Sequence, residues 1–182
     1  MPWGESSDPR GRDEELHSFT SSGTMRLSDT VPDDHGVAGV PIPPFRSDGY
    51  LPEGLHLASE AEITFRFGAS APQRRRLVLR LRRWIDLVRQ IQGRRLLLDG
   101  SFVTAKEVPN DLDAVVLHPP DFEQQVEKGI EAALELEQML LSRRPEEIFA
   151  AEDDADWTNW VSFFSRTRED DGRRKGLVEI EL

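Results

Sequence analysis

The chain contains no cysteine among its 182 residues. Disulfide bonds, thiolate zinc sites and cysteine nucleophiles are therefore excluded. The sequence also lacks any apolar run that approaches the ~20 residues of a membrane-spanning helix. Its first residues, Met1-Pro2-Trp3-Gly4-Glu5, have neither the basic part nor the apolar part of a signal peptide. We therefore expect a soluble, cytoplasmic protein that does not interact with membranes.

Hydrophobic residues are sparse and charged residues are abundant in this sequence. They make up 37% and 31% of the chain, and the formal net charge is -11. One domain with a modest core, joined to some unstructured chain, is typical of this balance. An acidic surface repels phosphate backbones, which argues against indiscriminate nucleic-acid binding. The arginines between Arg74 and Arg95 favour a solvated helix face, with steering of a triphosphate or an RNA end as the alternative.

Residues 1–48 have the composition of a disordered acidic tail. Ser, Gly, Asp and Pro recur there, and no apolar periodicity persists beyond a few residues. The segment Val37–Phe45 is apolar but interrupted by prolines, so it is either extended or packed against a partner. The sequence thus predicts one folded domain over residues 49–182, preceded by this tail.

Apolar periodicity and capping signals predict the elements of the folded domain. Ser59 and Glu62 match a capping box that opens a short helix ending near Gly68. Ser70 is the predicted cap of a long helix that Gly93 ends. The other predicted elements are a strand at 96–98, a helical turn at 102–108, a strand at 111–117, a helix capped by Asp121 and reaching residue 140, a strand at 147–151, a helix at 156–164 and a half-exposed strand at 177–182. Together they predict an α+β fold in which a small mixed β-sheet carries its helices mainly on one face.

Two short polar motifs lie next to the predicted central strands. Gly100-Ser101 follows the apolar run Leu96–Leu98, and Asp111-Leu112-Asp113 opens the next strand. The glycine allows a phosphate to approach the backbone closely, and the serine adds a hydroxyl and an amide at the start of a helical turn. Residues two apart on a strand project to the same face, so the two aspartates are predicted to point together.

Two aligned carboxylates are suited to Mg²⁺, which prefers oxygen ligands and shares its coordination shell with substrate phosphates. In a two-metal site, one ion activates the incoming hydroxyl and both ions stabilise in-line displacement at the α-phosphate. The motifs therefore predict a phosphate and magnesium site, with Asp111 and Asp113 as the metal ligands. We interpret Asp99, directly before the glycine, as a turn or cap residue and not as a ligand.

The segment Leu97–Ser101, taken together with Asp111–Val116, resembles the signature of the DNA polymerase beta-like nucleotidyltransferase superfamily. Within that superfamily it is most similar to the minimal nucleotidyltransferases, which include antitoxins paired with HEPN toxins. It is more similar still to an uncharacterised bacterial family with the string L-D-G-S-F-V-T-x-K-x-x-P-x-D-x-D. This likeness extends from Leu51–His56 to the ending Phe163–Ile180 and does not include the amino-terminal tail.

The superfamily resemblance implies that Gly100 and Ser101 hold nucleotide phosphates and that Asp111 and Asp113 act at the catalytic metals. The chain departs from the minimal nucleotidyltransferases in two places. Its gap between the serine and the first aspartate is shorter, and their Ala-Arg-Gly is replaced by a segment that ends in Lys106. This lysine is therefore the candidate to take over the nucleotide-binding work of their arginine.

A third carboxylate is expected on a later strand of such an enzyme. Glu146 or Glu147 is the best-placed candidate, and we assign Glu147 to the catalytic set, with Glu152 as the runner-up. The predicted reaction is Mg²⁺-dependent transfer of a nucleoside monophosphate from a nucleoside triphosphate to a hydroxyl of protein or RNA. The alternative is a non-catalytic binding module on the same fold, an antitoxin-like or regulatory partner of a protein encoded nearby.

Two further residue patterns bear on these alternatives. Val115 stands where haloacid-dehalogenase-like phosphatases usually have a threonine, which disfavours a metal-dependent phosphohydrolase. Trp157, Trp160 and Phe164 share one face of a predicted helix, and we interpret that face as core packing and not as a surface for base stacking.

Overall fold

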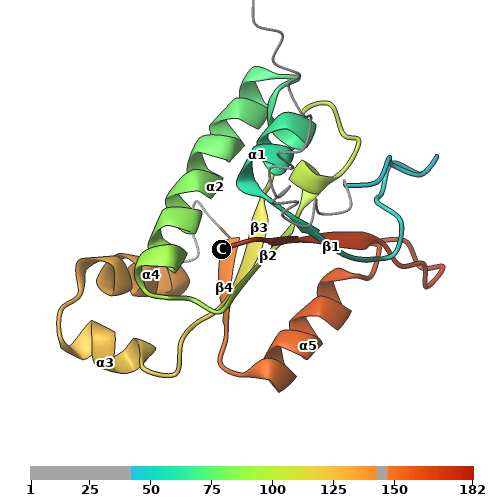
Figure 1. Ribbon diagram of the computed structural model, residues 1–182. Coiled ribbons are helices and arrows are strands. Elements are labelled where there is room, and N and C mark those ends of the chain that lie inside the picture. The colour runs from blue at the N-terminus through green and yellow to red at the C-terminus, as the bar shows by residue number, and fades with distance from the viewer. Residues whose placement is uncertain (1–41, 143–146) are drawn as a thin grey trace, which may run out of the picture. The chain divides into compact units, whose positions relative to one another are not determined.

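The computed structural model describes residues 42–142 and 147–182, with the backbone alone of Glu147 (Figure 1). Its centre is a five-stranded sheet in the order β1-β5-β2-β3-β4. The strands are β1 (Gly54–Ala58), β2 (Arg95–Asp99), β3 (Asp113–Leu117), β4 (Glu147–Ala151) and β5 (Gly176–Ile180). β1 pairs in parallel with β5, and β3 with β4, while β2 runs antiparallel to both β3 and β5. The sheet is therefore mixed, as predicted.

The described residues form five α-helices around this sheet. They are α1 (Glu60–Ile63), α2 (Pro72–Gln90), α3 (Phe122–Glu127), α4 (Glu131–Ser142) and α5 (Asp154–Phe164). A π-helical turn, η1 (Thr64–Gly68), continues α1, and a short 3-10 turn, η2 (Ser101–Val103), follows β2. Figure 1 shows α5 on the opposite side of the sheet from α2 and α4.

Side chains that alternate along the strands form two separate cores, as the pleat of a sheet requires. Leu96 and Leu98 pack in the larger core together with buried residues of α1, α2 and α4. Leu97 packs in the smaller core, on the other face, with Trp157 of α5. The predicted α+β fold, with a mixed sheet and helices mainly on one face, is confirmed.

The predicted start of the first helix is confirmed. Ser59 Oγ accepts the N–H of Glu62 at 3.3 Å, and the Glu62 carboxylate accepts the N–H of Ser59 at 2.8 Å, which completes the capping box. The predicted cap of the next helix is wrong, because α2 begins at Pro72 and its cap is Ala71, which makes no side-chain cap bond. A residue before proline is confined to extended backbone, and Ala71 (φ −144°, ψ 154°) has that conformation, so the helix cannot begin earlier.

The single helix predicted between Asp121 and residue 140 consists of two helices, α3 and α4. Gly129 lies between them with a φ of 72°. This left-handed backbone ends the helical hydrogen-bond ladder and is favoured at glycine. The side chain of Asp121 makes no cap hydrogen bond at the start of α3, contrary to the prediction.

The last strand lies deeper in the sheet than predicted. β5 runs between β1 and β2 and is buried along most of its length, whereas the sequence predicted a half-exposed strand. Its acidic residue Glu179 accepts two hydrogen bonds of 2.7 Å from the guanidinium of Arg95. Because this arginine neutralises the carboxylate, an alternating acidic sequence can form an inner strand. The helical turn predicted over 102–108 is also shorter, since only η2 forms.

Ile42 and Phe45 fall within the predicted tail but pack against the larger core. The ring centroid of Phe45 lies 6.0 Å from that of Phe67. The proline-interrupted segment therefore covers apolar surface of its own domain. The predictions for residues 1–41 and for Glu146 lie outside the described residues. No helix in the described ranges is both long enough and apolar enough to cross a membrane.

Candidate functional site

The two polar motifs meet at one edge of the sheet. β2 ends at Asp99 and β3 begins at Asp113, and these two residues are direct partners in the antiparallel ladder. The Gly100-Ser101 turn leaves β2 at the same edge and enters η2. Asp111 precedes β3, so it is not the strand residue that the sequence predicted. It nevertheless lines the same cavity as Asp113.

Ser101 holds Asp111 through several hydrogen bonds. The serine hydroxyl donates to Asp111 Oδ1, and the serine N–H donates to the same oxygen at 3.2 Å. The hydroxyl oxygen also accepts the backbone N–H groups of Asn110 at 2.9 Å and Asp111 at 3.3 Å. In this conformation Ser101 orients the first aspartate of the pair, a role that the sequence did not indicate.

Gly100 is required by the packing of the turn against the start of β3. Its φ of 82° is in the region that favours glycine. A Cβ at this position would lie 3.0 Å from both the carbonyl oxygen of Asp111 and the amide nitrogen of Asp113. The close neighbour of the glycine in the structure is thus the backbone of the aspartate motif, which the turn holds in place.

Asp99 forms a buried ion pair that the sequence did not predict. The residue is 4% exposed, and Lys175 Nζ lies 2.6 and 2.7 Å from its two carboxylate oxygens. Burial raises the pKa of the Asp99 carboxyl, and the charge of Lys175 acts in the opposite direction. Asp99 is therefore neither a simple turn residue nor an open metal ligand. Lys175 immediately precedes β5, and no local spacing links it to Asp99.

The strand register decides between the candidates for a third carboxylate. Glu147 is the direct parallel partner of Asp113, and Ala151 is the partner of Leu117 at the other end of β3. The backbone of Glu147 therefore lies beside the aspartate motif. Glu152 follows the far end of β4, roughly 16 Å away along the strand. The choice of Glu152 as the runner-up is wrong. β4 runs parallel to β3, so only the amino-terminal end of β4 reaches this edge of the sheet.

A cavity of ≈ 1080 Å³ opens at this edge of the sheet. Four carboxylates line it, from Asp48, Asp99, Asp111 and Asp113, together with the Gly100-Ser101 turn and the predicted nucleotide-binding residue Lys106. Aromatic side chains from β4 and α5 line another part of it, and further basic side chains come from the segment after α5. These additional lining residues are Phe149, Trp160, Phe163, Phe164, Arg166, Arg168 and Lys175.

Arg168 brings a positive charge close to the aspartate motif. Its Nη2 lies 3.6 Å from Asp111 Oδ2, while its side chain remains 90% exposed. Its neighbour Glu169 accepts a hydrogen bond of 3.2 Å from the hydroxyl of Tyr50, which ties this segment to the start of the domain. Asp48 accepts a further bond from Arg173 at 3.1 Å. The cation is therefore carried on a segment that is itself anchored.

Arg74 is buried next to the segment that follows the Gly-Ser turn. The interpretation of the arginines as a solvated helix face is therefore wrong for this residue. It is 4% exposed, and its guanidinium donates to the carbonyl oxygens of Phe67 at 3.0 Å and Phe102 at 2.8 Å. It also donates to the carbonyls of Thr104, at 2.8 Å, and Lys106. The fork of donors on one arginine thus fixes the segment that follows the Gly-Ser turn.

The described carboxylates fit magnesium as a partial set of ligands. Asp111 and Asp113 offer the hard oxygen donors that Mg²⁺ prefers, and Mg²⁺ is commonly held by one or two carboxylates plus substrate phosphates. Among the side chains that the structure describes, no group of three or more His, Cys, Asp or Glu could hold a metal ion by itself. Asp111 and Asp113 would hold such a metal together with the phosphates of a bound substrate.

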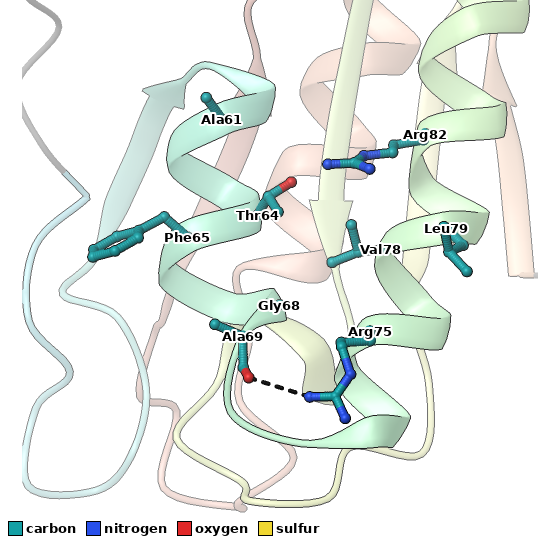
Figure 2. Close-up of a pocket in the computed structure, with 9 residues that line it drawn as sticks. All are labelled: Ala61, Thr64, Phe65, Gly68, Ala69, Arg75, Val78, Leu79 and Arg82. Carbon is teal, nitrogen blue, oxygen red and sulfur yellow. Dashed lines mark hydrogen bonds between the residues drawn. The ribbon is translucent and has the colours of Figure 1, made fainter.

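A second cavity, of ≈ 650 Å³, lies between the α1–η1 segment and α2 (Figure 2). Phe65, Val78 and Leu79 contribute apolar surface to it, and Arg75 donates to the carbonyl of Ala69 at 3.5 Å. No carboxylate lines this groove, and its only side-chain hydroxyl among the lining residues is that of a threonine. The edge of the sheet is thus the better candidate for acid, base or metal chemistry.

The chain belongs to a protein family described as a family of unknown function (DUF6932), which matches residues 43–181. This match covers the described domain and begins two residues before Phe45, one of the apolar residues that pack on the larger core. No curated protein and no solved structure matches the chain.

Proposed function

We propose that this member of DUF6932 is a Mg²⁺-dependent nucleotidyltransferase. One observation carries the proposal: the Gly-Ser turn and the aspartate motif meet at a sheet edge that opens into a cavity with both carboxylates and cations. Carboxylates alone would repel a triphosphate, and cations alone would not hold a metal. The combination suits a metal–triphosphate complex, because it provides partners for both of its components.

Each residue has a defined role in this proposal. Asp111 and Asp113 would hold the metal, whose chemistry is to polarise the α-phosphate and to lower the pKa of an attacking hydroxyl. The turn at Gly100-Ser101, together with Lys106 and Arg168, would bind the phosphates. These groups converge on the cavity from three segments of the chain.

The proposed reaction is an in-line substitution at phosphorus. The hydroxyl oxygen of a protein or RNA acceptor forms a bond to the α-phosphorus, and the bond from that phosphorus to the bridging oxygen of the β-phosphate breaks. Pyrophosphate leaves with the electron pair of the broken bond. The hydroxyl proton passes to a carboxylate base, for which we propose Glu147, because its backbone lies beside Asp113.

The test is label transfer from each of the four α-labelled nucleoside triphosphates, with Mg²⁺, to RNA and protein of a cell extract. We expect Asp111→Asn and Asp113→Asn each to reduce transfer by about 100-fold or more, since loss of a second-shell metal partner alone costs about 10–100-fold. Glu147→Gln should lower transfer, whereas Glu152→Gln, at the far end of β4, should not. Asp121→Asn, at the start of α3, is the matched control for loss of an aspartate charge.

Transfer that persists at the wild-type level in the Asp111→Asn/Asp113→Asn double variant would contradict this assignment. Thermal melting of each variant separates loss of activity from loss of folding. Omission of Mg²⁺ and addition of a chelator should abolish transfer by the wild-type protein.

A specific observation favours a second candidate, a binding module without catalysis. Several of the lining carboxylates already have protein partners, since Lys175 pairs with Asp99 and Ser101 binds Asp111. Such a module would bind nucleotide or a protein partner encoded nearby and would transfer no label. Nucleotide binding in the complete absence of transfer, with every acceptor fraction tested, supports this candidate over the enzyme.

A further inference from the structure

Four aromatic rings gather beside the carboxylates in the cavity. Phe149 of β4 lies with its ring centroid 4.9 Å from that of Trp160 and 5.8 Å from that of Phe164. Trp160 and Phe164, both on α5, stack at 5.7 Å with an interplanar angle of 22°. The indole N–H of Trp160 donates to the carbonyl of Ala150 at 3.1 Å. We call Phe149, Trp160, Phe163 and Phe164 the aromatic wall, and its rings are held by both the sheet and α5.

Phe163 is the member of the aromatic wall that faces solvent. It is 61% exposed, although it packs edge-on against Trp160 at 6.0 Å and Phe164 at 5.3 Å. Trp157, one turn and a half earlier on α5, is 2% exposed and belongs to the smaller core. The interpretation of this helix face as core packing is confirmed, because Trp160 and Phe164 also pack against the smaller core, and these two rings line the cavity as well.

Basic side chains follow the aromatic wall directly in the chain. α5 ends at Phe164, and Arg166 and Arg168 follow it within four residues. The guanidinium of Arg168 in turn approaches Asp111. An aromatic surface, cations and carboxylates therefore line one cavity, and these are the partners that a base, a phosphate and a metal ion need.

The strand register gives the distance between the aromatic wall and the aspartate motif. Phe149 is the parallel partner of Val115, two residues beyond Asp113 on β3. The aromatic wall therefore begins roughly 7 Å from the aspartate motif along the strand. A ribose bridges a comparable distance between a base and its α-phosphate.

We propose that the aromatic wall binds the base of the donor nucleotide, with Phe163 as the exposed stacking surface. This inference rests on the proposed function, because it concerns the nucleotide whose phosphates occupy the same cavity. A base-binding wall identifies the ligand as a nucleotide and not as a sugar phosphate or a bare polyphosphate. Stacking on an aromatic face does not depend on base identity, so purine and pyrimidine nucleotides should both bind.

The experiment measures equilibrium binding to the full-length protein by calorimetry, with Mg²⁺ present and no acceptor. The ligands are the four nucleoside triphosphates and inorganic tripolyphosphate, which keeps the phosphates but has no base. Phe163→Ala should weaken nucleoside triphosphate binding by about 5- to 150-fold, the range for loss of one base–aromatic stack. It should leave tripolyphosphate binding unchanged. Phe163→Trp keeps an aromatic ring and should bind nucleotide as the wild-type protein does.

Phe65→Ala is the matched control, because Phe65 is 84% exposed and lines the other cavity. It should change the binding of neither ligand. Equal nucleotide affinity in wild-type protein and Phe163→Ala overturns the inference, as does an equal loss for nucleotide and tripolyphosphate. Failure of the wild-type protein to bind any nucleoside triphosphate overturns it as well.

A label-transfer assay distinguishes failure of this inference from failure of the proposed function. A wild-type protein that transfers label, with Phe163→Ala fully active and binding normally, leaves the transferase intact and removes the aromatic wall from it. A protein that binds nucleotide through Phe163 but transfers no label keeps the base-binding role and overturns the transferase.

Discussion

The lining residues of the groove in Figure 2 all lie between positions 61 and 82, on α1, η1, the turn that follows η1, and α2. The carboxylate cavity instead takes its lining from residues spread between 48 and 175. The groove needs only two neighbouring helices and the apolar side chains between them. The cavity needs charges of opposite sign to be brought together from distant segments and kept there.

This difference lies in how the polar groups are held. At the groove, Arg75 makes one long hydrogen bond from an exposed position. At the cavity, Asp99 and Arg74 are buried and bonded to groups far away in the sequence. Removing one partner of a buried polar group leaves the other unsatisfied, which is far more destabilising than loss of an exposed contact. We therefore expect matched substitutions to have larger effects at the cavity than at the groove.

Lys175→Met should have the largest effect on stability. It leaves the Asp99 carboxylate buried without its cation, and loss of one partner of a buried pair destabilises a protein by about 3–5 kcal/mol. Chemical denaturation at neutral pH measures the change. Arg75→Met at the groove is the matched control, with an expected change within about 0.5 kcal/mol. Similar values for the two variants would contradict the comparison.

The pH dependence of Lys175→Met sharpens the same test. Burial raises the pKa of Asp99, and without the lysine charge this pKa should rise further. A carboxyl whose pKa is higher in the folded state binds protons on folding, so its charged form disfavours the fold as pH rises. The stability deficit of the variant should therefore shrink as pH is lowered toward the ordinary pKa of aspartate. Asp99→Asn in the Lys175→Met background should remove this pH dependence.

Arg74→Met should destabilise the protein by about 2–4 kcal/mol, since it leaves several buried carbonyl oxygens without a donor. Proteolysis and hydrogen exchange should also show faster opening of the segment after η2. Arg74→Lys should recover little of the loss, because one ammonium cannot reproduce the fork of a guanidinium. Wild-type protection of residues 102–106 in Arg74→Met would argue against this anchoring role.

Gly100→Ala should have the smallest of these effects, about 1–3 kcal/mol, because the residue has a positive φ and a Cβ would crowd fixed backbone. Gly68→Ala at the groove gives the comparison. Its Cβ would lie 2.4 Å from Val78 Cγ2, a side-chain atom. Val78→Ala should therefore relieve Gly68→Ala, whereas truncation of neighbouring side chains should not relieve Gly100→Ala. Denaturation midpoints of Gly100→Ala, Gly68→Ala, Val78→Ala and the Gly68→Ala/Val78→Ala double variant measure this difference.

Local sequence patterns predicted much of the fold. The strand at 147–151 has the predicted bounds, and the capping box at Ser59 forms as expected. Predictions failed where one local rule competed with another, as at Ala71, where the constraint of a following proline outweighed the capping preference of Ser70. Gly129 similarly divided a helix whose apolar stripe was continuous.

The candidate site was only partly predictable. Gly100, Ser101, Asp111 and Asp113 were found because they flank strands that pair directly with each other. The pairing of Lys175 with Asp99 spans 76 positions, and nothing in the spacing of either residue indicates it. The aromatic wall was missed because the helical period indicates only that Trp160 and Phe164 pack with Trp157, and it does not reveal that these rings also line a cavity.

The sequence by itself determined the type and rough limits of most elements and the polar motifs at the ends of β2 and β3. Only the tertiary structure decided which charges are buried, which segments reach the cavity and which end of β4 lies beside Asp113. The physical reason is that side-chain periodicity follows from backbone geometry within one element. Strand order and long-range ion pairs depend on how all elements pack together, and no local window of the sequence contains that information.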